Sequence, residues 1–174
     1  SANTQQLAVA IVRGAFEYQG QKCSAASRAY IPKEIWNETL DYIKGMIPQI
    51  KMGSSMGLSN FMNSVIDEKS FDTIVSYVER AKQSDKAEIV IGGNSDKSVG
   101  YFIEPTIIVT TDPQYETMTT ELFGPVITIY LYDADKYEET LALCDSTSPY
   151  ALTGSIFAHS RYDIDTAMQA LRYS

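Results

Sequence analysis

The pattern that most restricts the fold of this chain is an alternation of amphipathic helical stretches with short apolar runs rich in β-branched and aromatic residues. The helical spacing is clearest after Asp67, where apolar residues recur every three or four positions, and a second such stripe follows Pro32. Strand-like runs cover residues 89–91, 102–109, 126–132 and 152–158. Because these runs are largely apolar, we expect strands that are buried on both faces, and therefore an α/β fold with a mostly parallel sheet.

The remaining segments complete this expected organisation. Two further helices are predicted around Leu141 and Ala167, and the second helical pattern continues toward Ser174 without a capping residue. Residues 51–63 are rich in glycine, serine and methionine, have no clean period and are predicted to form a loop. No repeat or linker interrupts the chain, so residues 1–174 are expected to fold as a single domain that is a piece of something larger.

Composition narrows the possible partners. The chain has 174 residues, a formal net charge of −8 and a pI near 4.6, which disfavours nucleic acid and anionic membranes as partners. No apolar run reaches the roughly 18 residues of a membrane span, and no signal peptide is evident, so a non-secreted protein is expected. Two distant cysteines and the single histidine, His159, give neither a disulfide framework nor a metal-ligand spacing, so no metal site is predicted.

The candidate reactive group is the thiol of Cys23, which follows directly on Gly20-Gln21-Lys22. Glycine allows the backbone to approach a substrate closely, and a neighbouring lysine favours the thiolate, which is the form that attacks carbonyl carbons. The competing interpretation is that Cys23 is an inert core residue, since free cysteines are among the most buried residue types. Local chemistry alone leaves both possibilities open.

Three separated motifs resemble those of the aldehyde dehydrogenase family. They are Phe16-x-x-x-Gly20-Gln21-x-Cys23, then Glu121-Leu122-Phe123-Gly124-Pro125-Val126, and finally the stretch Tyr150–Phe157, which is similar to a later strand of the family. The resemblance implies a three-layer α/β/α catalytic domain that belongs to a homo-oligomeric parent enzyme. It also implies that the chain holds most of this domain, while the NAD-binding domain lies outside it.

The resemblance also implies roles for individual residues. Cys23 would be the catalytic nucleophile that passes through a thiohemiacetal and a thioester. Glu121 would bind the ribose hydroxyls of an NAD cofactor through charge-assisted hydrogen bonds, and Phe123 would pack against its nicotinamide. Lys22 and Ser24 would lie near the polar end of a small aldehyde substrate. Since the family's oxyanion asparagine and general base lie outside the chain, the isolated chain is expected to be inactive.

Within the family, residues 13–25 and 65–71 are similar to the subfamily that oxidises L-glutamate γ-semialdehyde to L-glutamate in proline breakdown. Such an enzyme is expected in the cytoplasm of a bacterium or the mitochondrial matrix of a eukaryote. Two departures from the subfamily pattern are Ala26, where a second cysteine is common, and Asn63-Ser64, where Gly-Pro is common. The second departure puts the shape of that loop in doubt, but not the nucleophile.

Three alternatives compete with this interpretation. Cys23 and His159 have a spacing compatible with a papain-like protease, but no tryptophan follows the cysteine and no asparagine partner follows the histidine. A non-catalytic α/β module that serves in assembly is a second alternative, which the retention of Cys23, Glu121 and Phe123 disfavours. An aldehyde dehydrogenase with a different substrate is the third.

Overall fold

The computed structural model describes residues 2–172 and is built around a four-stranded sheet. The strand order is β1 (Arg28–Pro32), β6 (Val126–Tyr132), β5 (Thr106–Thr110) and β2 (Ala87–Ile91). The pairs β1–β6 and β6–β5 are parallel, whereas β2 pairs with β5 in the antiparallel sense. The predicted mostly parallel sheet is therefore confirmed.

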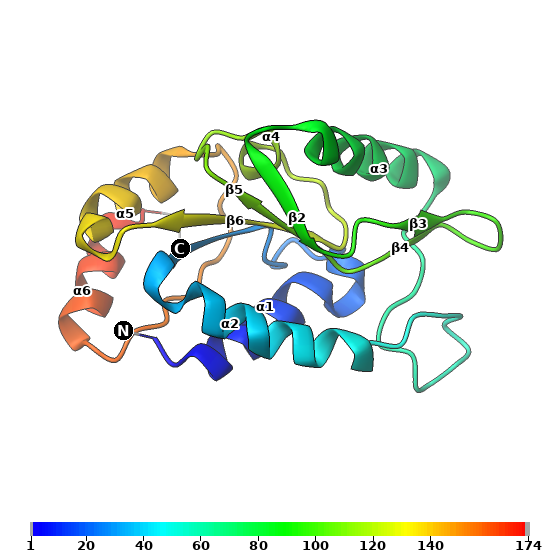
Figure 1. Cartoon of the computed structure of the whole chain (residues 1–174), viewed down its shortest axis with the longest axis horizontal. Helices are drawn as coiled ribbons and strands as arrows, with labels where there is room; N and C mark the ends of the chain where they lie inside the picture. Colours follow the sequence, from blue (N-terminus) through cyan, green and yellow to red (C-terminus); the bar gives the residue numbers. More distant parts are fainter. Residues whose placement is uncertain (1, 173–174) are drawn as a thin grey trace.

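Helices cover both faces of this sheet, as Figure 1 shows. Helices α1 (Thr4–Phe16) and α2 (Lys33–Met46) lie on one face, while α3 (Glu68–Gln83) and the short α4 (Glu116–Thr119) lie on the other. Adjacent residues of a strand point to opposite faces of the sheet. Ile107 therefore packs with the buried side chains of α1 and α2, and Ile108 packs with those of α3, which are called the α3 cluster below. The expected three-layer α/β/α arrangement is confirmed.

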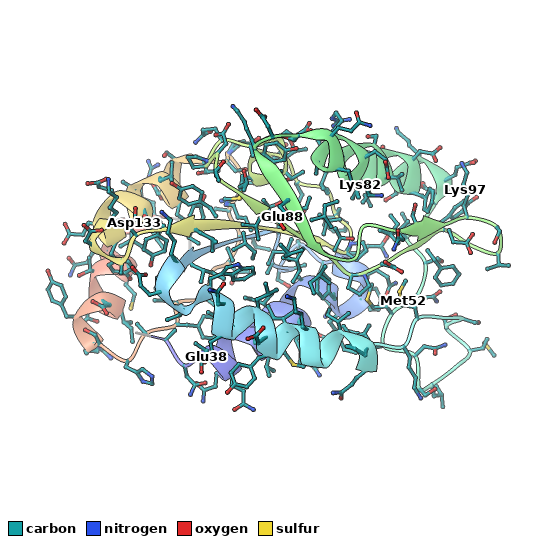
Figure 2. All side chains as sticks on the ribbon, in the orientation of Figure 1. Glu38, Met52, Lys82, Glu88, Lys97 and Asp133 are labelled. Carbon is teal, nitrogen blue, oxygen red and sulfur yellow. The ribbon has the colours of Figure 1, made fainter. Side chains whose placement is uncertain are left out.

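The two long surface helices form as their sequence periodicity predicts. Helix α3 begins after Asp67, whose carboxylate accepts a 2.7 Å hydrogen bond from the backbone N–H of Ser70. Its buried stripe consists of Phe71, Ile74, Val78 and Ala81. The buried stripe of α2 consists of Trp36, Thr39 and Ile43. Charged side chains such as Glu38 and Lys82 lie on the outer surfaces of these helices (Figure 2).

Helices α5 (Tyr137–Ser146) and α6 (Arg161–Ala170) pack together at one end of the sheet. The Tyr137 hydroxyl donates to the backbone carbonyl of Asp163, and Arg172 bonds to the carboxylate of Asp145. Helix α6 ends at Ala170, and Leu171 is already extended, so the helical pattern does not continue as predicted. Residues 173–174 lie outside the described part of the chain.

Other strand predictions were wrong in detail. The run 102–109 is split at Glu104-Pro105 into β4 (Phe102–Ile103), which pairs with β3 (Ser95–Asp96), and β5. Proline lacks the N–H that a continuous ladder requires, which explains the break. Strand β1 was not predicted, because it consists of only the five residues between α2 and the segment that carries Cys23 (residues 18–27, called the cysteine segment below). No strand forms over 152–158, where the side chains are largely exposed.

Residues 51–63 form the predicted loop without a helix or a named strand, and the loop closes on itself. The backbone N–H groups of Phe61 and Met62 both donate to the carbonyl of Lys51, and Met52 forms an isolated bridge with Met62. Short 3-10 turns supply three further connections: η1 (Glu17–Gly20), η2 (Ile47–Gln49) and η3 (Ala134–Lys136).

Candidate active site

The cysteine segment follows α1 through an unusual backbone turn. Tyr18, Gln19 and Gly20 have φ values of 59°, 58° and 66°, so three consecutive residues adopt the left-handed conformation. A side chain in this conformation costs about 1–2 kcal/mol for each residue that is not glycine. Cys23 then lies exposed in a turn that is closed by a 3.0 Å hydrogen bond from the N–H of Ala25 to the carbonyl of Lys22. Exposure on a turn excludes the interpretation of Cys23 as a core residue within the described chain.

Close backbone packing joins this segment to the Glu121–Val126 motif. A Cβ atom built on Gly20 would overlap the carbonyl oxygen of Gly124 and lie 2.8 Å from the carbonyl oxygen of Ala15. Only glycine satisfies both the positive φ and this approach. The two motifs, which are far apart in the sequence, therefore lie in direct contact.

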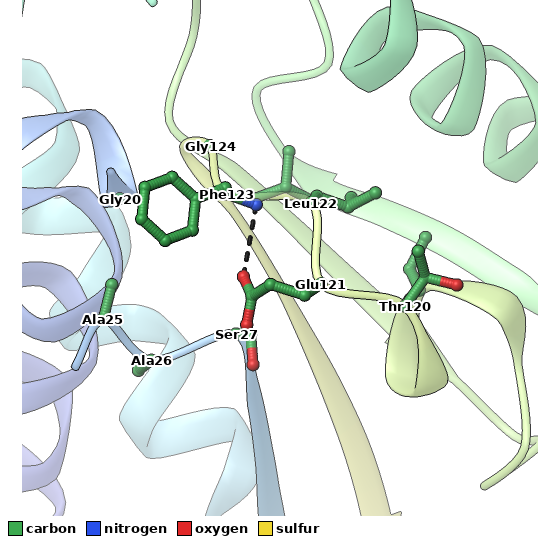
Figure 3. A pocket seen from close by; sticks show the side chains of 11 residues that line it. Gly20, Ala25, Ala26, Ser27, Thr120, Glu121, Leu122, Phe123 and Gly124 are labelled. Carbon is green, nitrogen blue, oxygen red and sulfur yellow. Dashed lines mark hydrogen bonds between the residues drawn. The ribbon is translucent and has the colours of Figure 1, made fainter. Parts of the chain in front are cut away.

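A small pocket lies at this contact, and Figure 3 shows it from close by. It is lined by Gly20, Ala25, Ala26 and Ser27 from the cysteine segment and by Thr117, Thr120, Glu121, Leu122, Phe123, Gly124 and Val126 from the second motif. Of the predicted site residues, the pocket contains Glu121 and Phe123. Lys22, Cys23 and Ser24 do not line it, although they lie in the chain between Gly20 and Ala25.

The conformations of Glu121 and Phe123 are coupled. Phe123 has a φ of 55°, and its N–H donates a 3.2 Å hydrogen bond to the Glu121 carboxylate, drawn as the dashed line in Figure 3. The Phe123 side chain is 44% exposed, which leaves much of an aromatic ring open beside a carboxylate. This pair could offer a planar apolar surface and a hydrogen-bond acceptor to one ligand. A nicotinamide riboside has both complementary features, so the residues present fit one end of NAD.

The charged neighbour of Cys23 is engaged in an ion pair. The Lys22 ammonium lies 3.1 Å from a carboxylate oxygen of Glu17, whose other oxygen lies 2.6 Å from the guanidinium of Arg13. The Lys22 ammonium also lies 5.9 Å from the centre of the Tyr18 ring. The hydrogen bond from Lys22 and the charge of Arg13 lower the pKa of Glu17 below its usual value. Lys22 is therefore held at the end of α1, one residue before the thiol.

Sequence reasoning missed the roles of two glutamines. The Gln21 side-chain oxygen accepts a 2.9 Å hydrogen bond from the N–H of Ile66, and the Gln19 side-chain amide donates at 3.3 Å to the carbonyl of Ser64. These bonds tie the cysteine segment to the residues that precede α3. Gln21 belongs to the sequence motif, whereas Gln19 occupies one of its unspecified positions, and the pattern gave no sign of the distant partner of either residue.

The second cysteine and the histidine occupy different environments. Cys144 lies on α5 and is partly buried, and this burial raises the pKa of its thiol. His159 is exposed and directly precedes α6, whereas Cys23 follows η1. In the described part of the chain, no hydrogen bond joins Cys23 to His159. No group of three or more His, Cys, Asp or Glu side chains suited to a metal occurs within residues 2–172.

The sequence matches the aldehyde dehydrogenase family over residues 1–174, and the chain belongs to that family. Among curated proteins, it is 56% identical to the mitochondrial Δ1-pyrroline-5-carboxylate dehydrogenase of Dictyostelium discoideum. The match extends over 161 residues, which are 92% of this chain and 29% of that protein. It is 42% identical to the human mitochondrial enzyme of the same name, over 99% of the chain and 31% of the relative.

A solved structure shows the same likeness. The Δ1-pyrroline-5-carboxylate dehydrogenase of Mycobacterium tuberculosis bound with NAD superposes with a TM-score of 0.89 at 38% identity, over 99% of this chain and 31% of the other. The chain thus spans about a third of the length of these relatives. Within residues 2–172, no helix combines the length and the apolar character needed to cross a membrane.

Proposed function

We propose that this chain is most of the catalytic domain of an enzyme that oxidises L-glutamate γ-semialdehyde, the open form of Δ1-pyrroline-5-carboxylate, to L-glutamate with NAD. The observation that carries the proposal is the contact between Gly20 and Gly124, because it joins the exposed thiol segment to the Glu121–Phe123 pocket. The names of the most similar relatives support the choice of substrate.

In the proposed mechanism, the thiolate of Cys23 attacks the aldehyde carbon, and a new S–C bond forms a thiohemiacetal. NAD supplies the acceptor for the hydride that leaves this carbon. Loss of the hydride converts the thiohemiacetal to a thioester on Cys23. Water then cleaves the S–C bond, which releases the carboxylic acid and regenerates the thiol. The backbone N–H of Cys23 contributes to stabilising the oxyanion in the first and last steps.

The other residues hold the reactants. Glu121 accepts hydrogen bonds from the ribose hydroxyls of the cofactor, and Phe123 packs against its nicotinamide, as their shared pocket supports. Lys22 and Ser24 flank the thiol and contact the polar end of the substrate. Residues 1–174 form one domain, and the NAD-binding domain, the general base and the rest of the substrate site belong to the remainder of a homo-oligomeric parent enzyme. The isolated chain is therefore inactive.

The mitochondrial names of the eukaryotic relatives support a mitochondrial matrix location if the source is a eukaryote, and a bacterial enzyme would be cytoplasmic.

The test is NADH formation by the full-length parent enzyme on glutamate semialdehyde and, separately, on a plain aliphatic aldehyde. We expect activity on the semialdehyde that Cys23→Ala abolishes, while Cys144→Ala, a matched change at the partly buried second thiol, keeps it. Activity on the plain aldehyde alone would retain the family chemistry and refute the substrate. Activity that survives Cys23→Ala would refute the nucleophile.

A further inference from the structure

We propose that Gln21, assisted by Gln19, is a positioning residue that fixes Cys23 for attack by anchoring its turn to residues 63–66. The inference rests on the proposed function, because it takes Cys23 as the nucleophile. Gln21 is separated from Cys23 by a single residue, and its partner Ile66 is 45 positions away in the sequence. The position of the thiol is thus set by a segment that belongs to a different part of the fold.

Two hydrogen bonds make this anchor, and they run in opposite senses. Gln21 accepts from the N–H of Ile66 at 2.9 Å, while Gln19 donates to the carbonyl of Ser64 at 3.3 Å. The two glutamines flank Gly20, which packs against Gly124. Gln19 is only 9% exposed, so its amide reaches this partner inside the protein. The segment before the thiol is therefore fixed at three successive residues.

The cysteine segment requires such support because its backbone is strained at residues 18 and 19. Tyr18 and Gln19 are left-handed without being glycine, and conformations of this kind persist only where the surroundings impose them. The backbone bonds around the thiol are local: the N–H of Gln21 donates to the carbonyl of Tyr18 at 3.1 Å, that of Ala25 to Lys22 at 3.0 Å, and that of Ala26 to Gly14 of α1 at 2.9 Å, and none of these three reaches the residues that precede α3. Without the glutamine contacts, the segment could relax toward ordinary φ values and displace the thiol.

The partner segment is itself firmly held. The N–H of Val65 donates to the carbonyl of Tyr101 at 2.9 Å, and the Val65 side chain is buried in the α3 cluster. Directly after Ile66, Asp67 caps α3. Residues 63–66 can therefore serve as a rigid support, and a shift there would be transmitted to Cys23 through Gln21.

Positioning of this kind affects rate more than binding. A displacement of the reacting atom by about 1 Å lowers rates on the order of a hundredfold. Residues 63–66 lie outside the pocket that contains Glu121 and Phe123, so a change at Gln21 should leave cofactor binding nearly intact. The inference therefore predicts a fall in kcat at an almost constant KM for NAD.

The experiment compares three variants of the full-length enzyme. Gln21→Met keeps the side-chain length and removes the acceptor, and Gln21→Glu keeps an acceptor oxygen. Gln49→Met is the matched control, because Gln49 makes one hydrogen bond to the Gly45 carbonyl at the end of α2. We expect kcat to fall about tenfold or more in Gln21→Met, to return to within about threefold of the parent in Gln21→Glu at its pH plateau, and to stay within about twofold in Gln49→Met.

Further readouts separate positioning from folding. Alkylation of Cys23 by iodoacetamide, which needs no bound geometry, should change less than about threefold in Gln21→Met. If that variant fails to fold in thermal unfolding, Gln19→Met replaces it with the same expectation.

A kcat within about twofold of the parent in the folded variant, or a Gln21→Glu variant as impaired as Gln21→Met, overturns the inference. Cys23→Ala is assayed in parallel: if it is inactive while Gln21→Met is fully active, only the positioning role fails. If Cys23→Ala is active, the proposed function fails.

Discussion

The cysteine turn and the Tyr150–Phe157 stretch both carry family-like motifs, yet their surroundings differ completely. The first is held by Gly124, Ser64 and Ile66, all from distant parts of the chain. The second makes no strand pairing within residues 2–172, and its Tyr150 and Leu152 side chains are 63% and 64% exposed. A motif thus acquires a defined structure from its partners and not from its own residues.

This difference has a physical basis. A strand needs a neighbouring backbone to satisfy its N–H and C=O groups, so β propensity alone does not create one. A left-handed run likewise needs enforcing contacts. Substitutions in each region can measure how strongly its structure depends on such contacts.

Gly20→Ala should have the largest effect, because the new Cβ would overlap the Gly124 carbonyl in a residue with positive φ. We expect a loss of about 3 kcal/mol in the free energy of unfolding, measured by urea denaturation. Gly45→Ala is the control, since α2 leaves open space there, and it should gain about 0.5 kcal/mol. Equal effects of the two changes would show that the Gly20 contact is unimportant.

Gly124→Ala should cost about 2 kcal/mol, because its Cβ would meet the Cδ1 atom of the fully buried Ile74. Ile74→Val removes that Cδ1 atom. The double variant should therefore lose about 1 kcal/mol less unfolding free energy than the sum of the two single losses, as a double-mutant cycle would measure. Strict additivity would mean that the second motif tolerates the extra atom by moving elsewhere.

The end of the sheet near α5 and α6 can be tested by pH. Burial raises the pKa of Tyr132 to about 12, and the charges of Tyr137 and Asp163 add to this shift. Folding therefore favours the neutral phenol. Its contribution to the free energy of unfolding is complete below pH 10 and is lost as the pH rises toward 12. We expect a decline of up to about 2 kcal/mol in unfolding free energy over that window, which Tyr132→Phe reduces. An identical decline in the variant would contradict the assignment to Tyr132.

Leu152→Asn should have the smallest effect in the 174-residue chain, within about 0.5 kcal/mol, because the side chain is exposed. The same substitution can be made in the full-length enzyme. A much larger loss there, again measured by urea denaturation, would identify a partner for this segment in the rest of the protein. A large loss in the 174-residue chain itself would contradict the exposed placement of Leu152.

Most of the layered fold could be predicted from hydrophobic periodicity. The stripes of α2 and α3 and the run 126–132 are long and regular, so their local pattern and their burial agree. Prediction failed where tertiary context decides. Proline split the run 102–109, and β1 was too short to produce a pattern. The segment 152–158 has a strand-like composition but pairs with no strand among residues 2–172.

The residue types of the candidate site could be proposed from sequence motifs, but the contacts that hold those residues in place could not. Cys23, Glu121 and Phe123 came from motifs, and the approach of Gly20 to the Gly124 carbonyl explains why the first motif contains glycine at position 20. The bonds from Gln19 and Gln21 join residues 45 positions apart, and no local spacing encodes such pairs. Lys22 directly precedes Cys23, and the ion pair between its ammonium and Glu17 was not predicted.

The register of the central sheet sets an order of events when the polypeptide is made. Strand β1 pairs in parallel with β6, so Arg28 cannot pair before Thr128 has been synthesised. Likewise, Gly20 cannot pack against Gly124 before that residue has been added. Parallel pairings between such distant segments form slowly, after local helices. We therefore expect a ribosome-bound chain to display Cys23 as an ordinary flexible thiol until the β6 segment has emerged. The turn that carries this thiol would therefore take its final shape only after Gly124 and β6 are available for packing.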